Sequence, residues 1–320
     1  MSKRIAIIVG HQGQDGRLLT ELLISRGYGV LGVGRSSGET FGPIIWTNPC
    51  RIDDASSISG AVAALEPDEI YYLAAHHASS ETRDSGDLRA EYLASVAVNV
   101  TGLLHFLEAI RNHSPRTRLF YASTSLIFGN QPVQSPQTET TPPAPEEAYA
   151  ILKLLGGNAC REYRERHGVF ASVGILFNHE SRWRSPTFLS RKIAKAAASA
   201  KAQGRLSLGF TLGNLDATVD WGYAPDFVDA FTRILALDRP DDFIVATGIA
   251  HTVRDFAAAA FGCVGLDWRD HVAVDASLIA QPRTGRMGDA GKLRRLTGWA
   301  PSVTFDELVR LLVEQAEAAS

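Results

Sequence analysis

The sequence predicts a doubly wound α/β fold: a parallel sheet with helices on both faces and a smaller, interleaved C-terminal substrate domain. Two observations predict this fold. Apolar runs of strand length alternate with amphipathic stretches of helix length, which is typical of parallel strands joined by crossover helices. A glycine-rich turn directly follows the first run, where such a sheet carries a phosphate-binding loop.

The strands are expected to be continuous apolar runs, because a strand covered on both faces buries every side chain. The predicted strands are residues 4–10, 29–34, a stretch near "PIIWT" at 43–47, 69–75, 118–123, 170–177 and 242–247. The stretches between them carry apolar residues at helical spacing. The predicted helices are residues 16–27, 55–66, 94–112 and 148–168.

These elements predict two domains. Residues 1–177, with a strand near 242–248, form the predicted dinucleotide-binding domain, and residues 178–320 form an interleaved substrate-binding lobe. In the lobe, helices are expected at 189–204, 253–265 and 305–320, whereas 206–226 is turn-rich with short strands. The proline-rich stretch 135–147 is predicted to be an active-site loop.

Composition excludes several classes of protein. The net charge of -3 over 320 residues is nearly balanced, so nucleic acid is not an expected partner. The three cysteines are scattered, which argues against a disulfide framework and a structural zinc site and favours a reducing cytoplasm. His76 and His77 follow a strand without a third ligand at metal spacing, so no metal is expected. No apolar run predicts a signal peptide or a membrane partner.

The first turn, "GHQGQDG", is a candidate cofactor loop. Its glycines allow a tight turn and a close approach of the backbone to a pyrophosphate at a helix N-terminus. The second strand ends at Arg35 and Ser36, which suit a ribose 2′-phosphate, so NADP(H) is favoured and NAD(H) is the alternative. Besides these two, the predicted cofactor contacts are Gly10, Gln12, Gly13, Gln14, Asp15, Gly16, Leu73, Ala74, Ala75, Tyr149 and Lys153.

A candidate catalytic group follows later in the chain. Tyr149 and Lys153 form a Y-x-x-x-K pattern at the start of a helix, which places both on one face. A nearby ammonium stabilises tyrosinate, so Tyr149 is a candidate acid or base. Ser123 and Thr124 end a strand in "STSLIFG", where hydroxyls could hold a reacting oxygen.

These motifs resemble those of the extended short-chain dehydrogenase/reductases, which are Rossmann enzymes, and specifically the GDP-mannose 4,6-dehydratase family. The similar segments, in order, are "GQDG", "RSS", "PDEIYYLAA", "ASTS", "GILFNHES", "FLSRKI", "LGNLDATVDWGYAPD" and "VATG…TVRDF". The resemblance implies a nucleotide-sugar substrate. It implies that Thr124 polarises the sugar O4, that Tyr149 removes the proton of this oxygen, and that Lys153 tunes Tyr149. It also implies substrate contacts from Asn178, Lys192 and Gly213. Ser123, beside Thr124, and Arg184 are further candidate substrate contacts.

The chain departs from the family pattern at three positions. Leu126 stands where the family has the glutamate that removes the C5 proton, and Val219 and Gln281 stand where it has arginines. Arg182, Arg184 or Arg283 could replace the lost guanidinium groups. Oxidation at C4, reduction of a 4-keto group or epimerisation is therefore favoured over elimination. Two alternatives stay open: a genuine GDP-mannose 4,6-dehydratase, and a non-catalytic dinucleotide-binding homologue.

The resemblance also bears on assembly. Proteins of this fold often dimerise through two long helices, which here contain "SVAVNVTGLLHFL" and "YAILKLLGG". The segment after "RSS" is shorter than in the family, where it contributes to a tetramer. A homodimer or a homotetramer is therefore expected.

Overall fold

The main element is a seven-stranded sheet with the strand order β10-β6-β5-β4-β1-β2-β3. The computed structural model describes residues 4–34, 38–48, 50–76, 87–130, 134–203, 210–275 and 285–318. Neighbouring strands are parallel, except that β2 and β3 are antiparallel. The strands are β1 (Ile5–Val9), β2 (Gly29–Val33), β3 (Glu39–Phe41), β4 (Glu69–Tyr72), β5 (Arg118–Thr124), β6 (Phe170–Leu176) and β10 (Asp242–Val245).

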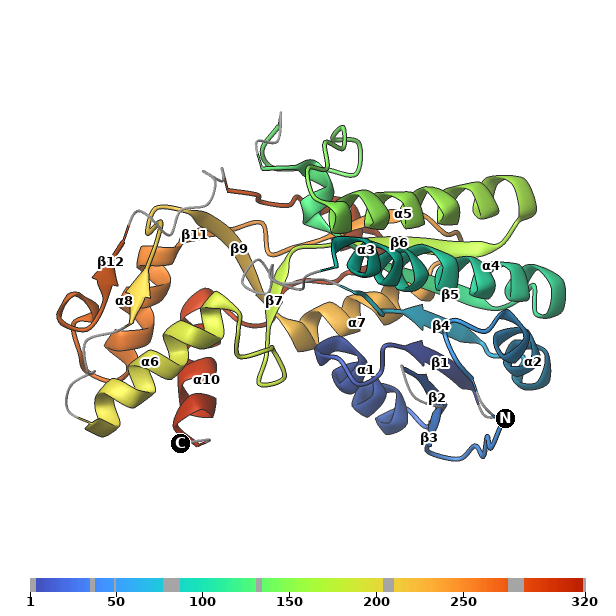
Figure 1. Ribbon diagram of the computed structural model, residues 1–320, viewed down its shortest axis with the longest axis horizontal. Coiled ribbons are helices and arrows are strands. Elements are labelled where there is room, and N and C mark those ends of the chain that lie inside the picture. The colour runs from blue at the N-terminus through green and yellow to red at the C-terminus, as the bar shows by residue number, and fades with distance from the viewer. Residues whose placement is uncertain are drawn as a thin grey trace.

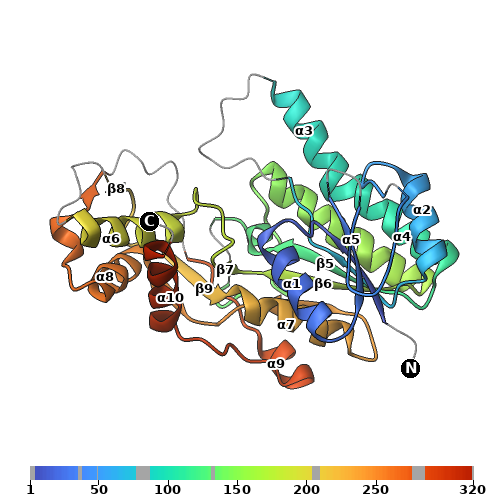
Figure 2. The same cartoon turned by 90° about the horizontal axis from the view of Figure 1, so that it is seen from below.

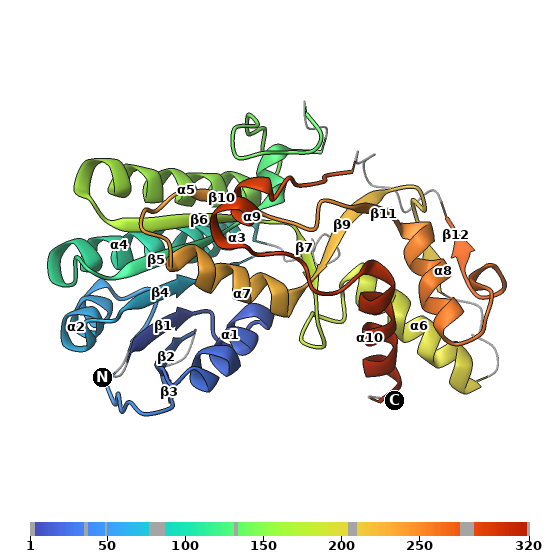
Figure 3. The same ribbon diagram turned by 180° about the vertical axis from the view of Figure 1, so that it is seen from behind.

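Helices cover both faces of this sheet, which confirms the doubly wound fold (Figure 1). On one face lie α2 (Ala55–Leu65), α4 (Gly102–His113) and α5 (Ala148–His167). On the other lie α1 (Gln14–Ser25), α7 (Ala224–Leu235) and α9 (Gly291–Thr297), which Figure 3 shows from behind. Phe120 of β5 stacks on Phe231 of α7 with ring centroids 4.4 Å apart.

A second, smaller body follows the end of β6 (Figures 1 and 2). Its helices α6 (Leu189–Gln203), α8 (Val253–Cys263) and α10 (Phe305–Glu317) share a core with β9 (Thr218–Tyr223). In its three-stranded sheet, β9 lies between β7 (Asn178–Glu180) and β11 (Ala250–Thr252). A separate two-stranded sheet pairs β8 (Thr211–Leu212) with β12 (Ala273–Val274). The chain crosses between the two bodies, because β10 and α7 return to the large sheet.

The predicted strand at "PIIWT" is wrong. The third strand is β3, which starts four residues earlier and pairs antiparallel with β2. Pro43 cannot donate a backbone hydrogen bond, and the side chain of Ile45 is 87% exposed, so this apolar run does not pack as a buried strand.

Two predicted helical boundaries also differ. The helix predicted at 94–112 starts earlier, at α3 (Leu88–Val96), and continues through a π-helical turn (Ala97–Thr101) into α4. This stretch, Leu88–His113, is long and apolar enough to cross a membrane by length and composition, and half of its most apolar window is buried in the protein. The turn-rich stretch predicted at 206–226 ends in helix α7, which begins at Ala224 with Pro225 in its first turn.

Candidate active site

The candidate site lies at the carboxyl ends of the parallel strands. The glycine loop follows β1, Ala74 follows β4, Ser123 and Thr124 end β5, and Asn178 follows β6. Ligands of open α/β sheets bind at this edge, because the loops after the strands leave a crevice there. The glycine loop, Ala74, Ser123, Thr124 and Asn178 thus follow or end neighbouring strands at one sheet edge, whereas Tyr149 and Lys153 come from helix α5.

The glycine loop turns tightly and packs closely against neighbouring backbone. Gly10 has φ +91°, and a Cβ on it would lie 2.8 Å from the backbone nitrogen of Ala74. A side chain on Gly16 would collide with the backbone of Gly10 and His11. Gly13 precedes α1 and offers no side-chain cap, so the first-turn amides of α1 remain available to an anion. These residues fit the pyrophosphate of a dinucleotide.

Lys153 is buried beneath this edge. Its Nζ donates to the carbonyl of Ala122 at 2.8 Å and to that of Ala74 at 3.3 Å, so the ammonium joins the ends of β5 and β4. It lies 5.9 Å from the centroid of the Tyr149 ring, one helical turn earlier on α5. Burial lowers the pKa of Lys153 to about 7. The lysine therefore changes charge close to neutral pH.

Tyr149 is held in its neutral form. Burial raises the pKa of its hydroxyl to about 12, with the charge of Arg184 acting against this and that of Asp15 adding to it. The hydroxyl is therefore a proton donor at neutral pH. A positive charge nearby favours tyrosinate. A charged Lys153 or a cationic ligand would therefore lower the pKa of Tyr149, so that the same residue could act as a base.

Thr124 and Leu126 lie beside each other at the end of β5. The Leu126 amide donates to Thr124 Oγ1 at 3.3 Å, within a 3₁₀ turn over Ser125–Phe128. Leu126 is half-buried and brings no acid to the site. The carboxylate of Glu146, near the end of the same loop, binds the amide nitrogen and the side-chain nitrogen of Asn130 at 2.8 and 2.7 Å.

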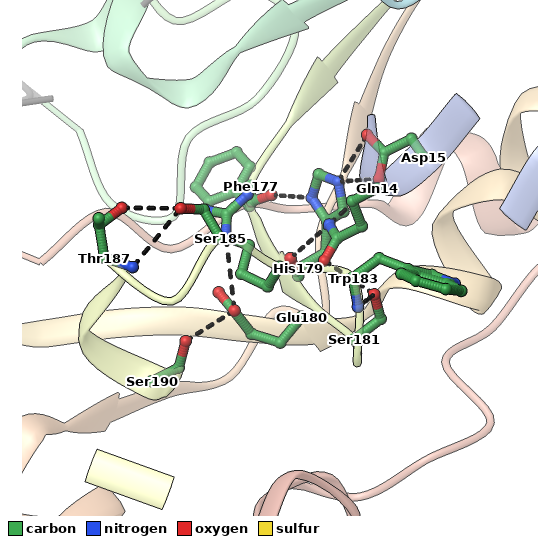
Figure 4. A network of polar contacts seen from close by, with 11 residues as sticks. Gln14, Asp15, Phe177, His179, Glu180, Ser181, Trp183, Ser185, Thr187 and Ser190 are labelled. Atoms are coloured by element: carbon green, nitrogen blue, oxygen red, sulfur yellow. Dashed lines mark hydrogen bonds and ion pairs between the residues drawn. The ribbon is translucent and has the colours of Figure 1, made fainter. Parts of the chain in front are cut away.

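A polar network connects the first turn of α1 to the loop after β6 (Figure 4). His179 Nε2 lies 3.0 Å from both carboxylate oxygens of Asp15, and its Nδ1 lies 2.7 Å from the carbonyl of Phe177. Gln14 donates to the carbonyl of His179 and accepts from Ser181 Oγ. The predicted cofactor residues Gln14 and Asp15 therefore direct their side chains toward this loop.

The same network orients Arg184. Its Nε lies 3.4 Å from the buried Glu180 carboxylate, which also accepts a hydrogen bond from Ser190, and its guanidinium lies 3.6 Å from the centroid of Phe188. Arg184 and Arg182 are two of the arginines that could replace the family's missing ones. Arg184 is half-buried, and its charge lowers the pKa of Tyr149. Arg182 is exposed and faces Glu21. The loop thus brings one of the predicted guanidinium groups within electrostatic range of Tyr149.

The remaining predicted residues are distributed over the second body. Asn178 opens β7 and pairs with Trp221, Lys192 lies in the first turn of α6, and Gly213 directly follows β8. Arg35 and Ser36, predicted to bind the 2′-phosphate, lie outside the described residues, as do Gln281 and Arg283. Among the residues that the structure describes, no group of three His, Cys, Asp or Glu side chains could hold a metal.

Sequence reasoning missed two residues of this site. His179 lies in the segment "NHES". The sequence does not show that its imidazole is paired with the carboxylate of Asp15, which is far away along the chain. Arg286 forms a β-bridge with Val219, and its Nη1 donates to the carbonyl of Gly129 at 2.9 Å. Arg286 therefore pairs through its backbone with the position where the resemblance expects an arginine, while its guanidinium lies at the Gly129 carbonyl. No motif surrounds it, so the sequence alone gives no sign of it.

Solved structures with this fold include dinucleotide-binding enzymes. RMD from Pseudomonas aeruginosa, solved with NADPH, is 20% identical with a TM-score of 0.81 and covers 99% of this chain and 100% of its own. UDP-glucose 4-epimerase from Thermus thermophilus, solved with NAD, is 22% identical with a TM-score of 0.78 over 99% and 100% of the two chains. The fold is thus that of the Rossmann-type epimerases and dehydratases.

Relatives of higher identity narrow this to a class: the chain is an enzyme of the nucleotide-sugar epimerase and dehydratase class. GDP-mannose 4,6 dehydratase 2 of Arabidopsis thaliana is 38% identical over 98% of this chain and 87% of its own length. The model of the GDP-mannose 4,6 dehydratase family matches residues 7–312. The chain belongs to that family.

Proposed function

We propose that this enzyme transfers a hydride at C4 of a nucleotide-diphosphate hexose, a GDP-sugar, with NADP(H) as the favoured cofactor. The net reaction is C4 oxidation, reduction of a 4-keto group or epimerisation. One observation carries this proposal: Tyr149 and Lys153 are arranged for acid-base chemistry, while Leu126 replaces the acid needed for elimination. Residues 178–320 form the proposed substrate-binding lobe.

The roles of the residues follow from their positions. Thr124 Oγ1 and Ser123 end β5 and orient the sugar O4, and Tyr149 exchanges the proton of that oxygen. Lys153 raises or lowers the basicity of Tyr149 through its own charge. Asn178, Arg184, Lys192 and Gly213 contact the nucleotide-sugar. When bound, the dinucleotide supplies the hydride donor or acceptor. The residues that would hold it are Gly10, Gln12, Gly13, Gly16, Leu73, Ala74 and Ala75. Arg35 and Ser36 would hold a 2′-phosphate.

Elimination lacks its base in this arrangement. A positioned acid or base contributes roughly 10²- to 10⁴-fold to a rate, and the leucine supplies neither function. The carboxylate of Glu146 is engaged with Asn130 in the same loop. Loss of water from the sugar is therefore expected to be slow, whereas hydride transfer at C4 does not require this acid.

The test is a comparison of two substrates. The protein with NADP(H) is incubated with GDP-mannose and, separately, with GDP-4-keto-6-deoxymannose, and the products are followed by mass spectrometry. Reduction at C4 adds two hydrogens and is detected by mass, whereas a C4 epimer keeps the mass of its substrate and is identified by NMR; one of these two products is expected. Rapid loss of water from GDP-mannose contradicts the role given to Leu126 and identifies a genuine 4,6-dehydratase, the activity that family membership favours. If neither substrate nor other nucleotide-sugars react, and Tyr149→Phe changes nothing, the chain is a non-catalytic homologue.

We also propose a cytoplasmic homodimer or homotetramer. Large apolar side chains on α3, α4 and α5 are exposed, namely Leu88, Tyr92, Leu93, Leu104, Ile151 and Leu155. Exposed apolar side chains on these helices indicate an interaction surface, and the two long helices would bury them against a second copy. Light scattering on the purified protein measures the mass directly, and a monomer at micromolar concentration contradicts the proposal.

A further inference from the structure

A buried carboxylate lies at the junction of the two bodies. The chain passes between them where β9 leads into α7, where β10 leads toward β11, and where residues 285–290 lead into α9 (Figures 1 and 3). Asp220 lies inside β9 and is 1% exposed. The next residue, Trp221, belongs to the core of the second body. The carboxylate of Asp220 is therefore a polar group enclosed at the boundary of that core.

This carboxylate accepts four hydrogen bonds, each from another passage of the chain. Its Oδ1 accepts from the amide and the hydroxyl of Thr247 at 3.0 and 2.6 Å. Its Oδ2 accepts from the amides of Gly248 and Gly288 at 3.0 and 3.3 Å. Thr247 and Gly248 follow β10 of the large sheet, and Gly288 precedes α9, which packs on that sheet. Asp220 therefore ties a strand of the second body to two segments that come from the large sheet.

The segment that contains Gly288 fits closely between the two bodies. A Cβ on Gly285 would collide with the hydroxyl of Thr218 at the start of β9. A Cβ on Gly288 would lie 2.6 Å from the side chain of Ala246 and 2.7 Å from the ring of Phe177, at the ends of β10 and β6. The backbone alone thus fills the space between β9 and the large sheet at these two positions.

The same segment is joined to the loop that leads to Tyr149. Gln137 in this loop is fully buried, and its amide donates to the carbonyl of Met287 at 2.8 Å. Its Oε1 accepts from the amide of Met287 at 3.0 Å, and its carbonyl accepts from the amide of Asp289 at 2.8 Å. The loop continues into α5, whose first turn carries Tyr149. The segment therefore connects the second body, the large sheet and the active-site loop.

We propose that Asp220 is a positioning residue that sets the placement of the second body relative to the catalytic residues. In the proposed function a nucleotide-sugar bridges the two bodies, because Lys192 and Gly213 lie in the second body whereas Thr124 and Tyr149 lie in the large one. A bridging ligand gains affinity from both ends only when the separation of the two sites matches its length. A ligand that touches one body does not depend on this separation. The inference rests on the proposed function and adds the residue that favours a bridging substrate.

The experiment replaces this carboxylate with an amide of the same shape. Whichever way the amide of Asp220→Asn is turned, its Nδ2 faces at least one backbone N–H, so that hydrogen bond is lost. Thr247→Val removes one donor to the carboxylate and is a milder second variant, which decides the question if Asp220→Asn does not fold. Asp216→Asn is the matched control, because Asp216 is exposed and pairs with Arg254 inside the second body.

Calorimetry measures the dissociation constants of GDP-mannose, GDP and NADP⁺ for each protein. Asp220→Asn is expected to weaken GDP-mannose binding about tenfold, because its two ends no longer meet both bodies in the right geometry. GDP and NADP⁺ are each expected to contact one body, so their constants should change less than about twofold. Thr247→Val should act in the same direction by a smaller factor. Asp216→Asn should keep all three constants.

The ratio of the GDP-mannose and GDP constants distinguishes positioning from stability. A residue that only stabilises the fold lowers the midpoint of urea unfolding and leaves this ratio unchanged in the folded protein. If the ratio stays within about twofold of the wild-type value in the folded variants, Asp220→Asn and Thr247→Val, the inference alone is overturned. Failure of the wild-type protein to bind GDP-mannose overturns the proposed function and the inference together.

Discussion

His179 and Asp15 form an enclosed pair that joins the loop after β6 to the first turn of α1 (Figure 4). His179 Nδ1 faces a backbone carbonyl and Nε2 faces a carboxylate, so both nitrogens must donate and the imidazole is cationic. Burial works against this charge, but Asp15 outweighs it and raises the pKa of His179. Although burial acts in the opposite direction, His179 holds the pKa of Asp15 below its ordinary value.

Removing one partner of this pair is expected to destabilise the protein. Asp15→Asn leaves the buried His179 imidazole without its counter-charge. His179→Gln leaves the Asp15 carboxylate without its counter-charge. We expect each to lower the free energy of unfolding by about 2–3 kcal/mol, because an enclosed charge loses its partner. Urea denaturation measures the change. Glu21→Gln, which removes the exposed partner of Arg182, is the control and should cost less than about 1 kcal/mol.

The contribution of this pair should depend on pH. The pKa of His179 is raised above its ordinary 6.5, so the stabilisation is complete below that pH and disappears as the pH rises through the folded-state value. The pKa of Asp15 is lowered below its ordinary 3.8, so the stabilisation also disappears as the pH falls through that lower value. The difference in unfolding free energy between wild type and Asp15→Asn is therefore expected to be largest between these limits. A difference that grows steadily above neutral pH contradicts the assignment.

Tyr149→Phe is expected to remove most of the activity and leave the fold intact. The variant lacks the hydroxyl that exchanges the substrate proton, which predicts a fall in kcat of roughly 10²- to 10⁴-fold. The dissociation constant of the nucleotide-sugar should change little. Tyr163→Phe, on the same helix but bonded to Glu108, is the matched control and should retain wild-type kcat.

Leu126→Glu tests the role of the missing acid. The substitution restores a carboxylate beside Thr124, and we expect formation of a dehydrated product from GDP-mannose to rise by roughly 10²-fold or more. Leu126→Gln has nearly the same shape but no acid function and serves as the control. Product masses distinguish the two. Equal rates of water loss in both variants and in the wild type would show that position 126 does not govern the reaction.

Arg286→Met is expected to weaken substrate binding. The backbone of Arg286 pairs with Val219, the position at which the resemblance implies a diphosphate-binding arginine, and a charge-assisted bond is worth about 1.5–3 kcal/mol. KM for the nucleotide-sugar should rise roughly tenfold or more, with a smaller change in kcat. Arg286→Lys should recover part of the loss, because it keeps the charge without the planar fork. An unchanged KM in Arg286→Met assigns this side chain to the Gly129 loop alone.

Local pattern was enough to predict much of the fold. The continuous apolar runs and the glycine loop predicted the parallel strands and the phosphate-binding edge, because both depend on neighbouring residues. The apolar run at 43–47 failed as a strand because pairing with β2 was taken by Glu39–Phe41. Helix α7 was missed because the turn-rich stretch was extended to Asp226, although its apolar residues recur at helical spacing and Pro225 lies in its first turn.

The residues of the candidate site likewise fall into those that local sequence spacing predicts and those that depend on distant partners. The spacing of Tyr149 and Lys153 lies within one helix, so the sequence shows it. The partners of His179, Arg286 and Asp220 are 27 to 164 residues away along the chain, and no local pattern indicates such contacts. These three residues became visible only when the folded chain brought their partners to them.

The return of the chain to the large sheet has a consequence for the order of synthesis. While the first 177 residues leave the ribosome, β6 is a sheet edge without its neighbour, and Phe120 lacks the ring of Phe231. Both are supplied only after β7, α6 and β9 have been made. An unpaired strand edge invites contacts with other chains. The nascent protein therefore cannot complete its large sheet until Val245 has been made, after the first strands and helix of the second body.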